Sequence, residues 1–167
     1  MIVLNKLPLF IVTGSSGSGK THVIPELRKL LPEYDVFDVD IIWDGKQDWQ
    51  VVKNNWFRVA RSIAESGRCT VLCGTILPWE AEKYDQFESF SRVYFLNLHC
   101  DSDVRRERLI KRGWTEEQVV EYQTFAQWLL DNANSKFDPP MPTIDTSNTP
   151  PDEVASAIAG WIQSLVN

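Results

Sequence analysis

The sequence predicts an α/β fold in three layers: a five-stranded parallel sheet with helices on both faces. Short apolar, β-branched runs alternate along the chain with segments whose apolar residues recur at helical spacing. Strands that alternate with helices form parallel βαβ units, and these place helices on both faces of the sheet. A loop rich in glycine and serine separates the first run from the first helical segment. The 167 residues are expected to form a single domain.

The predicted strands differ in how far they are buried. The first and the third are apolar nearly throughout, as expected of central strands covered on both faces. The second alternates polar and apolar residues and ends in two acids, Asp38 and Asp40. The predicted strands are residues 9–13, 34–40, 69–73, 93–98 and 143–146.

The helices are predicted from periodicity and from their end signals. The first begins near Lys20, so Pro25 falls beyond its first turn, where we expect a bend. Gly113 separates two helices, and Thr115 with Gln118 forms a capping box for the second of them. The predicted helices are residues 20–31, 49–66, a short one from 78, 101–112, 115–133, and a final one after Pro150 and Pro151.

Composition limits the partners and the compartment. A net charge of −6 and a pI of about 4.9 make a nucleic acid polymer an unfavourable partner. The three cysteines are an odd number, which favours a reduced, cytoplasmic setting. Pro8 splits the apolar N-terminal run, which argues against a secretion signal, and no run approaches membrane-spanning length. We therefore expect no membrane partner.

Residues 14–21, Gly-Ser-Ser-Gly-Ser-Gly-Lys-Thr, match the phosphate-binding pattern G-x-x-x-x-G-K-[ST]. The glycines allow backbone N–H groups to turn inward around a phosphate, and the small serines leave room for it. Lys20 adds a positive charge, and the hydroxyl of Thr21 is suited to a Mg²⁺ shell. A flexible linker is the alternative, but a linker needs neither the flanking strand and helix nor the Lys-Thr pair. The predicted nucleotide ligands are Gly14, Ser15, Ser16, Gly17, Ser18, Gly19, Lys20 and Thr21.

Asp38 and Asp40 are expected to point to one face of the second strand, beside this loop. Such a pair suits a metal on one acid and a substrate hydroxyl on the other; a cap or a solvated strand end is the alternative. No acid follows the third strand, where many nucleotide hydrolases keep their metal-organising Asp, so Asp38 is the better Mg²⁺ candidate. The chain also lacks the Asp-x-x-Gly and Asn-Lys-x-Asp motifs of GTPases.

Four arginines follow the fourth strand. Arg108 and Arg112 lie four residues apart, so they share a helix face and are candidates to hold phosphates or a base. For Arg105 and Arg106 we expect a solvated helix face paired with nearby acids.

Together, residues 14–21, Asp38-x-Asp40, Arg108-Leu-Ile-Lys-Arg112 and Ile144-Asp-Thr resemble the small phosphate-loop kinases of the nucleoside monophosphate, shikimate and gluconate kinase group. The resemblance implies the P-loop NTPase fold, ATP and Mg²⁺, and a short helical lid at about 108–135. It implies that Arg108 packs on adenine and Arg112 meets the phosphates. Asp38 would then serve the metal and Asp40 the acceptor hydroxyl, and the segment after Asp145 would border the adenine.

The sequence thus predicts an ATP-dependent phosphotransferase, a monomer or homodimer, that moves the γ-phosphoryl group to a small molecule. Lys20, Asp40 and Arg112 are its expected catalytic residues. Nucleosides or nucleotides compete as acceptors with a metabolite or antibiotic hydroxyl, and a regulatory ATP-binding module is the alternative outside enzymes. The further acceptor-site candidates are Trp43, which with Trp49 would form an aromatic wall, and Arg58 and Arg61. Ordinary packing of the two tryptophans and plain surface charge on the two arginines are the alternatives.

Overall fold

The computed structural model describes residues 5–166. Its sheet has five strands in the order β2-β3-β1-β4-β5, and every pair is parallel. The predicted α/β fold is therefore confirmed. The strands are β1 (Leu9–Thr13), β2 (Tyr34–Asp38), β3 (Cys69–Cys73), β4 (Val93–His99) and β5 (Thr143–Asp145). The α-helices are α1 (Ile24–Leu30), α2 (Trp49–Glu65), α3 (Pro78–Ala81), α4 (Ser102–Lys111), α5 (Glu116–Asn132) and α6 (Pro151–Val166).

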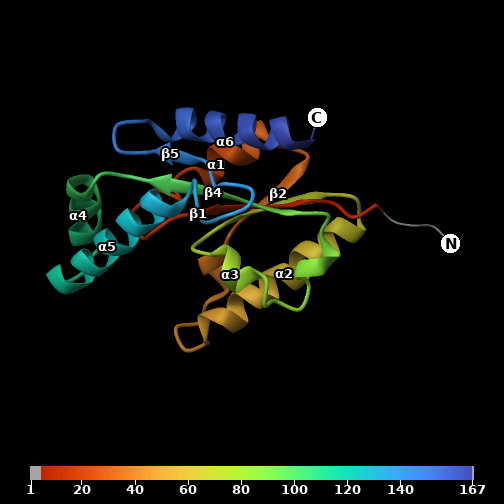
Figure 1. Cartoon of the computed structure of the whole chain (residues 1–167), viewed down its shortest axis with the longest axis horizontal. Helices are drawn as coiled ribbons and strands as arrows, with labels where there is room; N and C mark the ends of the chain where they lie inside the picture. The colour runs from red at the N-terminus through yellow and green to blue at the C-terminus, as the bar shows by residue number, and fades with distance from the viewer. Residues whose placement is uncertain (1–4, 167) are drawn as a thin grey trace.

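The alternation of side chains in β1 creates a hydrophobic core on each face of the sheet. Phe10 and Val12 face the core that α1 and α6 cover, whereas Leu9 and Ile11 face the core beneath α2. All five residues of β1 are buried, as expected of a central strand in a parallel sheet. Figure 1 shows α1 and α6 on one side of the sheet and α2 and α3 on the other.

The carboxyl ends of all strands meet at one edge of the sheet, where ligands bind in doubly wound folds. The loop of residues 14–21 leaves β1 at this edge, and α4 and α5 lie at the same end of the molecule, at the left in Figure 1. No helix in the described residues is long and apolar enough to cross a membrane.

Three local predictions were wrong. The first helix begins at Ile24 rather than near Lys20, and residues 20–23 form turns. Pro25 consequently lies in the first helical turn, where its missing N–H costs no hydrogen bond and no bend is needed. The second strand ends at Asp38, and Asp40 lies on a short 3₁₀ helix, η1 (Val39–Ile42).

Candidate active site

The loop after β1 depends on three glycines. Gly17 and Gly19 have φ of 83° and 98°, in the left-handed region that residues with a Cβ rarely adopt. Gly14 is required for space as well, since a Cβ there would lie 2.5 Å from the carbonyl oxygen of Leu98 in β4. At Gly17 a Cβ would lie 3.3–3.4 Å from Arg105 and Leu109 of α4, so the glycines also let the loop pack closely against β4 and α4. The geometry fits a cradle for phosphate groups.

Lys20 lies inside this loop. Its Nζ donates to the carbonyl oxygens of Gly14 at 2.7 Å and Ser15 at 3.0 Å. Burial lowers the pKa of Lys20 to about 8, an effect that the negative charge of Asp40 opposes. The lysine is therefore held where a polyphosphate would meet it, and an incoming anion would favour its charged form.

One contact joins the loop to the end of β2. Thr21 Oγ1 donates to Asp38 Oδ2 at 3.3 Å, and the other carboxylate oxygen of Asp38 accepts from the backbone N–H of Asp40 at 3.0 Å. Asp38 thus caps η1, as the structural alternative supposed, while its second oxygen faces the loop. Gly74, which follows β3, lets η1 approach closely: a Cβ there would lie 2.6 Å from Cβ of Val39.

Asp40 reaches the loop from η1 rather than from a strand. Burial raises the pKa of Asp40 above its ordinary value and the charge of Asp38 adds to the rise, while Lys20, Lys53 and Arg112 oppose it. The carboxylate is therefore a stronger base than a solvated aspartate and lies within electrostatic range of these three cations.

Two arginines of α4 hold the phosphate loop through its carbonyl groups. Arg108 donates to the carbonyl oxygens of Gly17 at 2.9 Å and Thr146 at 3.0 Å. Arg105 donates to the carbonyl oxygen of Ser16 at 2.6 Å and is only 1% exposed. The expectation of a solvated, acid-paired Arg105 was wrong. Arg106 is exposed as expected, but it pairs with Glu116 of α5 rather than with the expected Asp101, Asp103 or Glu107.

Arg112 and Thr146 complete the surroundings of the loop. Arg112 lies at the C-terminal end of α4, exposed, and its charge acts on both Lys20 and Asp40. Thr146, directly after β5, donates through Oγ1 to the carbonyl oxygen of Ser18 at 2.7 Å. The segment 108–135 also contacts the loop, because Ser15 Oγ donates to the carbonyl oxygen of Tyr122 in α5 at 2.9 Å.

The predicted acceptor residues on α2 lie elsewhere. Arg58 forms an ion pair with Asp85 at 2.7 Å, and Arg61 pairs with Glu65 at 3.0 Å. Arg61 also lines a hollow with Asn5, Lys6 and Leu7, which precede β1 at the opposite edge of the sheet from the loop. The prediction that Arg58 and Arg61 hold an anionic acceptor is therefore not supported.

Trp43 does lie near the loop edge. It follows η1, is 41% exposed, and stacks on Trp49 with ring centroids 4.7 Å apart. Its backbone N–H donates to the carbonyl oxygen of Asp40 at 3.1 Å, so the aromatic pair adjoins the acid.

One pair beside Asp40 was missed. Lys53 of α2 pairs with Glu80 of α3 at 3.2 Å, and only 11% and 19% of these two side chains are exposed. Glu80 also accepts from Gln50 at 2.9 Å and from the backbone N–H of Leu77 at 2.9 Å. The two charges come from helices 27 residues apart, and neither stands in a motif. A lysine among the apolar positions of a predicted helix, at 53 between Val52 and Trp56, was the available signal.

The donor set around Thr21 fits Mg²⁺. A hydroxyl and a carboxylate oxygen are hard ligands, and Mg²⁺ commonly binds one or two protein oxygens together with phosphate oxygens and water. Within residues 5–166 there is no group of three or more His, Cys, Asp or Glu side chains arranged for a metal. An ion here would therefore depend on its nucleotide for further ligands.

No protein-family model matches the chain, and no curated protein matches its sequence. Its fold is similar to that of several solved structures. A tunicamycin resistance protein of Deinococcus radiodurans matches with a TM-score of 0.66 at 19% identity, over 94% of this chain and 96% of the other. A gluconokinase of Sinorhizobium meliloti matches with a TM-score of 0.60 at 15% identity, over 98% and 99%.

A shikimate kinase of Acinetobacter baumannii, in complex with shikimate, matches with a TM-score of 0.57 at 20% identity, over 95% of this chain and 94% of that one. At such identities the likeness concerns the fold. The likeness extends over essentially the whole chain.

Proposed function

We propose that this protein is an ATP-dependent kinase that transfers the γ-phosphoryl group to a hydroxyl of a small molecule. The observation that carries the proposal is the contact of Thr21 with Asp38 at 3.3 Å, which joins a phosphate cradle to a pair of acids. A nucleotide-binding module needs the cradle alone. A phosphotransferase also needs a carboxylate facing the place where the γ-phosphate ends, and Asp40 supplies it.

The loop amides and Lys20 would hold the β- and γ-phosphates, with Thr21 and Asp38 as the ligands of Mg²⁺. The bound ion would supply neutralisation of charge on the phosphate oxygens. Arg108 and Thr146 would border the adenine. The helical segment 108–135 would act as the lid, since α5 already bonds to the loop through Ser15.

In the transfer step the acceptor oxygen forms a bond to the γ-phosphorus as the bond from that phosphorus to the β,γ-bridging oxygen breaks. ADP leaves with the electron pair of the broken bond, and the hydroxyl proton of the acceptor passes to Asp40. Lys20 and Arg112 offset the charge of the transferring group. Catalysis of this kind is mostly positioning and electrostatic stabilisation.

The test is acceptor-stimulated release of ADP. Lys20→Ala is expected to abolish turnover while leaving the thermal unfolding transition in place, because Lys20 is tied only to the loop. Asp40→Asn should retain ATP binding and lose transfer. If ADP release by the unsubstituted protein is the same with every acceptor as with ATP alone, the protein is not a kinase, and a regulatory ATP-binding module becomes the better description.

A further inference from the structure

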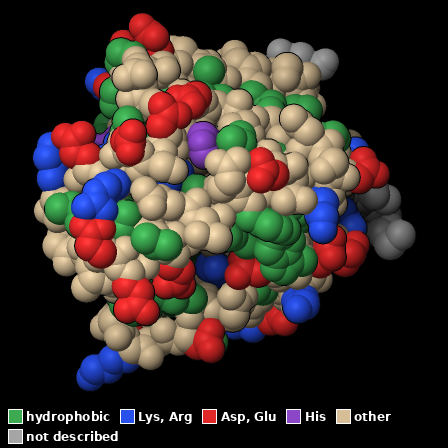
Figure 2. Space-filling model, turned by 60° about the vertical axis from the view of Figure 1, so that its left-hand side comes forward, with side chains coloured by type: hydrophobic (Ala, Val, Ile, Leu, Met, Phe, Trp, Pro, Cys, Tyr) green, Lys and Arg blue, Asp and Glu red, His purple; other side chains and the backbone are tan. Residues whose placement is uncertain are grey.

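Beyond Asp40 the candidate site is bordered by exposed apolar side chains. Ile41, Ile42 and Trp43 follow it directly in the chain and are 64%, 41% and 41% exposed. Contiguous exposure of large apolar residues is uncommon on a soluble protein and marks surfaces that bind something. Figure 2, which turns the loop end of the molecule forward, shows hydrophobic side chains gathered beside a recessed basic side chain and several acids.

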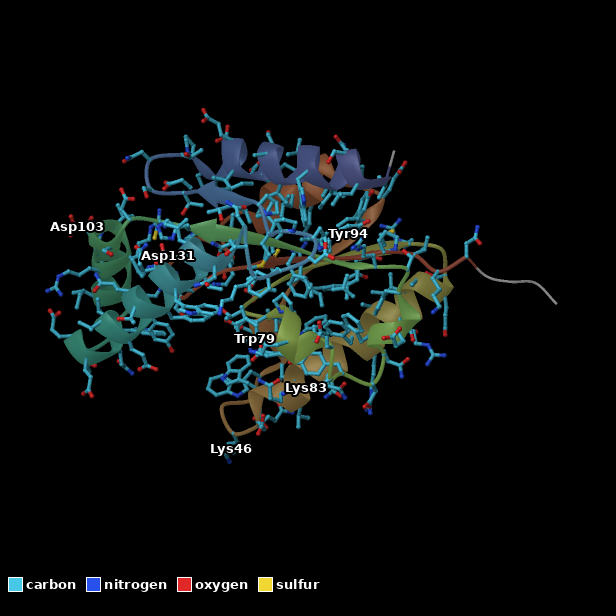
Figure 3. All side chains as sticks on the ribbon, in the orientation of Figure 1. Lys46, Trp79, Lys83, Tyr94, Asp103 and Asp131 are labelled. Atoms are coloured by element: carbon cyan, nitrogen blue, oxygen red, sulfur yellow. The ribbon has the colours of Figure 1, made fainter. Side chains whose placement is uncertain are left out.

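A second apolar surface comes from α3 and α5. Trp79 is 40% exposed and Trp128 is 38% exposed; their rings meet edge to face at 5.5 Å, and Trp79 also stacks on Phe137 at 5.8 Å. Figure 3 shows Trp79 on the same side of the sheet as the loop that carries Lys46.

The two surfaces flank the first turn of α2. Trp49, in that turn, stacks on Trp43. The next residue, Gln50, bonds to Glu80 at 2.9 Å, and Glu80 is the chain neighbour of Trp79. Both surfaces are therefore connected to the N-terminal part of α2, from which the charge of Lys53 acts on Asp40.

The α2 cation that acts on Asp40 is already paired. Lys53 is neutralised by Glu80, in a pair of which only 11% and 19% of the side chains are exposed. The other cations acting on Asp40 are Lys20 and Arg112, which the proposed transfer needs for the γ-phosphoryl group. A carboxylate or phosphate on the acceptor would lie near the acids at 38 and 40 with no cation of its own, and like charges at such distances repel.

We propose that the acceptor is a neutral alcohol carrying an aromatic or aliphatic group, bound with its hydroxyl at Asp40 and its apolar part between Ile41, Trp43 and Trp79. This inference rests on the proposed kinase activity and specifies its substrate class. It differs from the anionic acceptors named for two proteins of similar fold, shikimate and gluconate. Burial of one ring against such a surface is worth a factor of about ten or more in affinity.

The test uses two hydroxy acids without an aromatic ring, shikimate and quinate, each with its methyl and benzyl esters. The methyl ester removes the charge, and the benzyl ester then adds a ring, while the hydroxyl groups stay the same. Two quantities are measured: kcat/KM for ADP release, and the shift in Tm in the presence of Mg²⁺ and a non-hydrolysable ATP analogue. Both should rise from acid to methyl ester to benzyl ester, by about tenfold in kcat/KM at each step. Acids that equal or exceed their benzyl esters overturn the inference.

Substitutions test whether the ring of the benzyl esters binds at the proposed apolar surface. Ile41→Ala and Trp79→Ala should lower kcat/KM for the benzyl esters by about fivefold while changing the methyl esters little, because only the ring contacts these side chains. Leu30→Ala is the matched control, since Leu30 is 42% exposed on α1, and it should change neither. Glu80→Gln leaves Lys53 without its partner and should raise the ratio of acid to benzyl-ester turnover. Equal losses for both kinds of ester, or an unchanged ratio, contradict the inference.

Binding of the ATP analogue is measured separately from binding of the acceptor. If no acid or ester alters ADP release or Tm, the inference fails. Stabilisation by the ATP analogue that disappears in Lys20→Ala then shows that the nucleotide site survives, whereas its absence in the unsubstituted protein means that the proposed function has failed as well.

Discussion

The close approach of η1 to the end of β3 makes Gly74→Ala the sharpest test of how the acids are positioned. The added Cβ would lie 2.6 Å from Cβ and 2.8 Å from Cγ2 of Val39. Ordinary carbon contacts are about 3.5–4.0 Å, so η1 must move by about 1 Å. The φ of Gly74 is not positive, so the cost is steric overlap alone. Overpacking of this kind costs about 1–3 kcal/mol.

For a chain of this length such a loss lowers Tm by about 2–10 °C. The larger effect should be on turnover, because Asp38 and Asp40 lie at the start of η1 and would move with it. A displacement of about 1 Å in a reacting group lowers kcat by about a hundredfold. Calorimetry gives Tm, and a coupled assay for ADP gives kcat at saturating ATP and acceptor.

Gly160→Ala is the control for Gly74→Ala. Gly160 lies within α6 with no atom within 4 Å of its would-be Cβ, so the same substitution should stabilise the protein by about 0.5–1 kcal/mol. Opposite signs at the two glycines are expected. A Gly74→Ala protein with the parent Tm and kcat would refute the argument that close packing of η1 positions the acids.

Three further results are expected. Burial lowers the pKa of Lys20 to about 8, and ATP favours the charged form of Lys20, so the affinity for ATP should fall about tenfold per pH unit above pH 8 in titrations from pH 7 to 10. Lys20→Arg should bind ATP without this pH dependence. An affinity of the unsubstituted protein that does not change with pH contradicts the role of Lys20. Thr21→Val should leave Tm unchanged and raise the Mg²⁺ concentration needed for half-maximal turnover about tenfold. An unaltered Mg²⁺ requirement would exclude the Thr21 hydroxyl as a ligand. Arg105→Met, which removes the donor to Ser16, should lower the free energy of unfolding in urea by about 1–3 kcal/mol. Arg106→Met is the control and should leave the urea midpoint unchanged. Equal effects of the two substitutions would contradict a structural role that only Arg105 has.

The sheet was predictable from the sequence because strand burial and loop chemistry are local signals. The apolar run of β1 and the glycine pattern behind it are read within a dozen residues. Where the first helix begins was not predictable in the same way. The turns over 20–23 delay it to Ile24, and Pro25 at the start of α1 was itself the signal that a bend in mid-helix was the wrong interpretation.

The candidate site was predicted less completely, because much of it is built from pairings between distant segments. Nothing in the chain near Arg105 says that it turns inward to Ser16 while Arg106 turns outward; the packing of α4 over the loop decides this. The same holds for Lys53 and Glu80, which meet only because α2 and α3 lie together on one face. Arg58 likewise pairs with Asp85, 27 residues away, and no local pattern in the sequence indicates this contact.

Lys20 has a consequence for which anions the loop accepts. With its amine bonded to two carbonyl oxygens of its own loop, the protein carries a built-in competitor for any incoming negative charge. An ammonium has three N–H donors, so these two bonds orient the amine and still leave a donor for an anion. In the proposed site a polyphosphate would meet this donor and the loop amides together, whereas a small monovalent ion would meet fewer of them. We therefore expect the loop to favour polyphosphates over small anions.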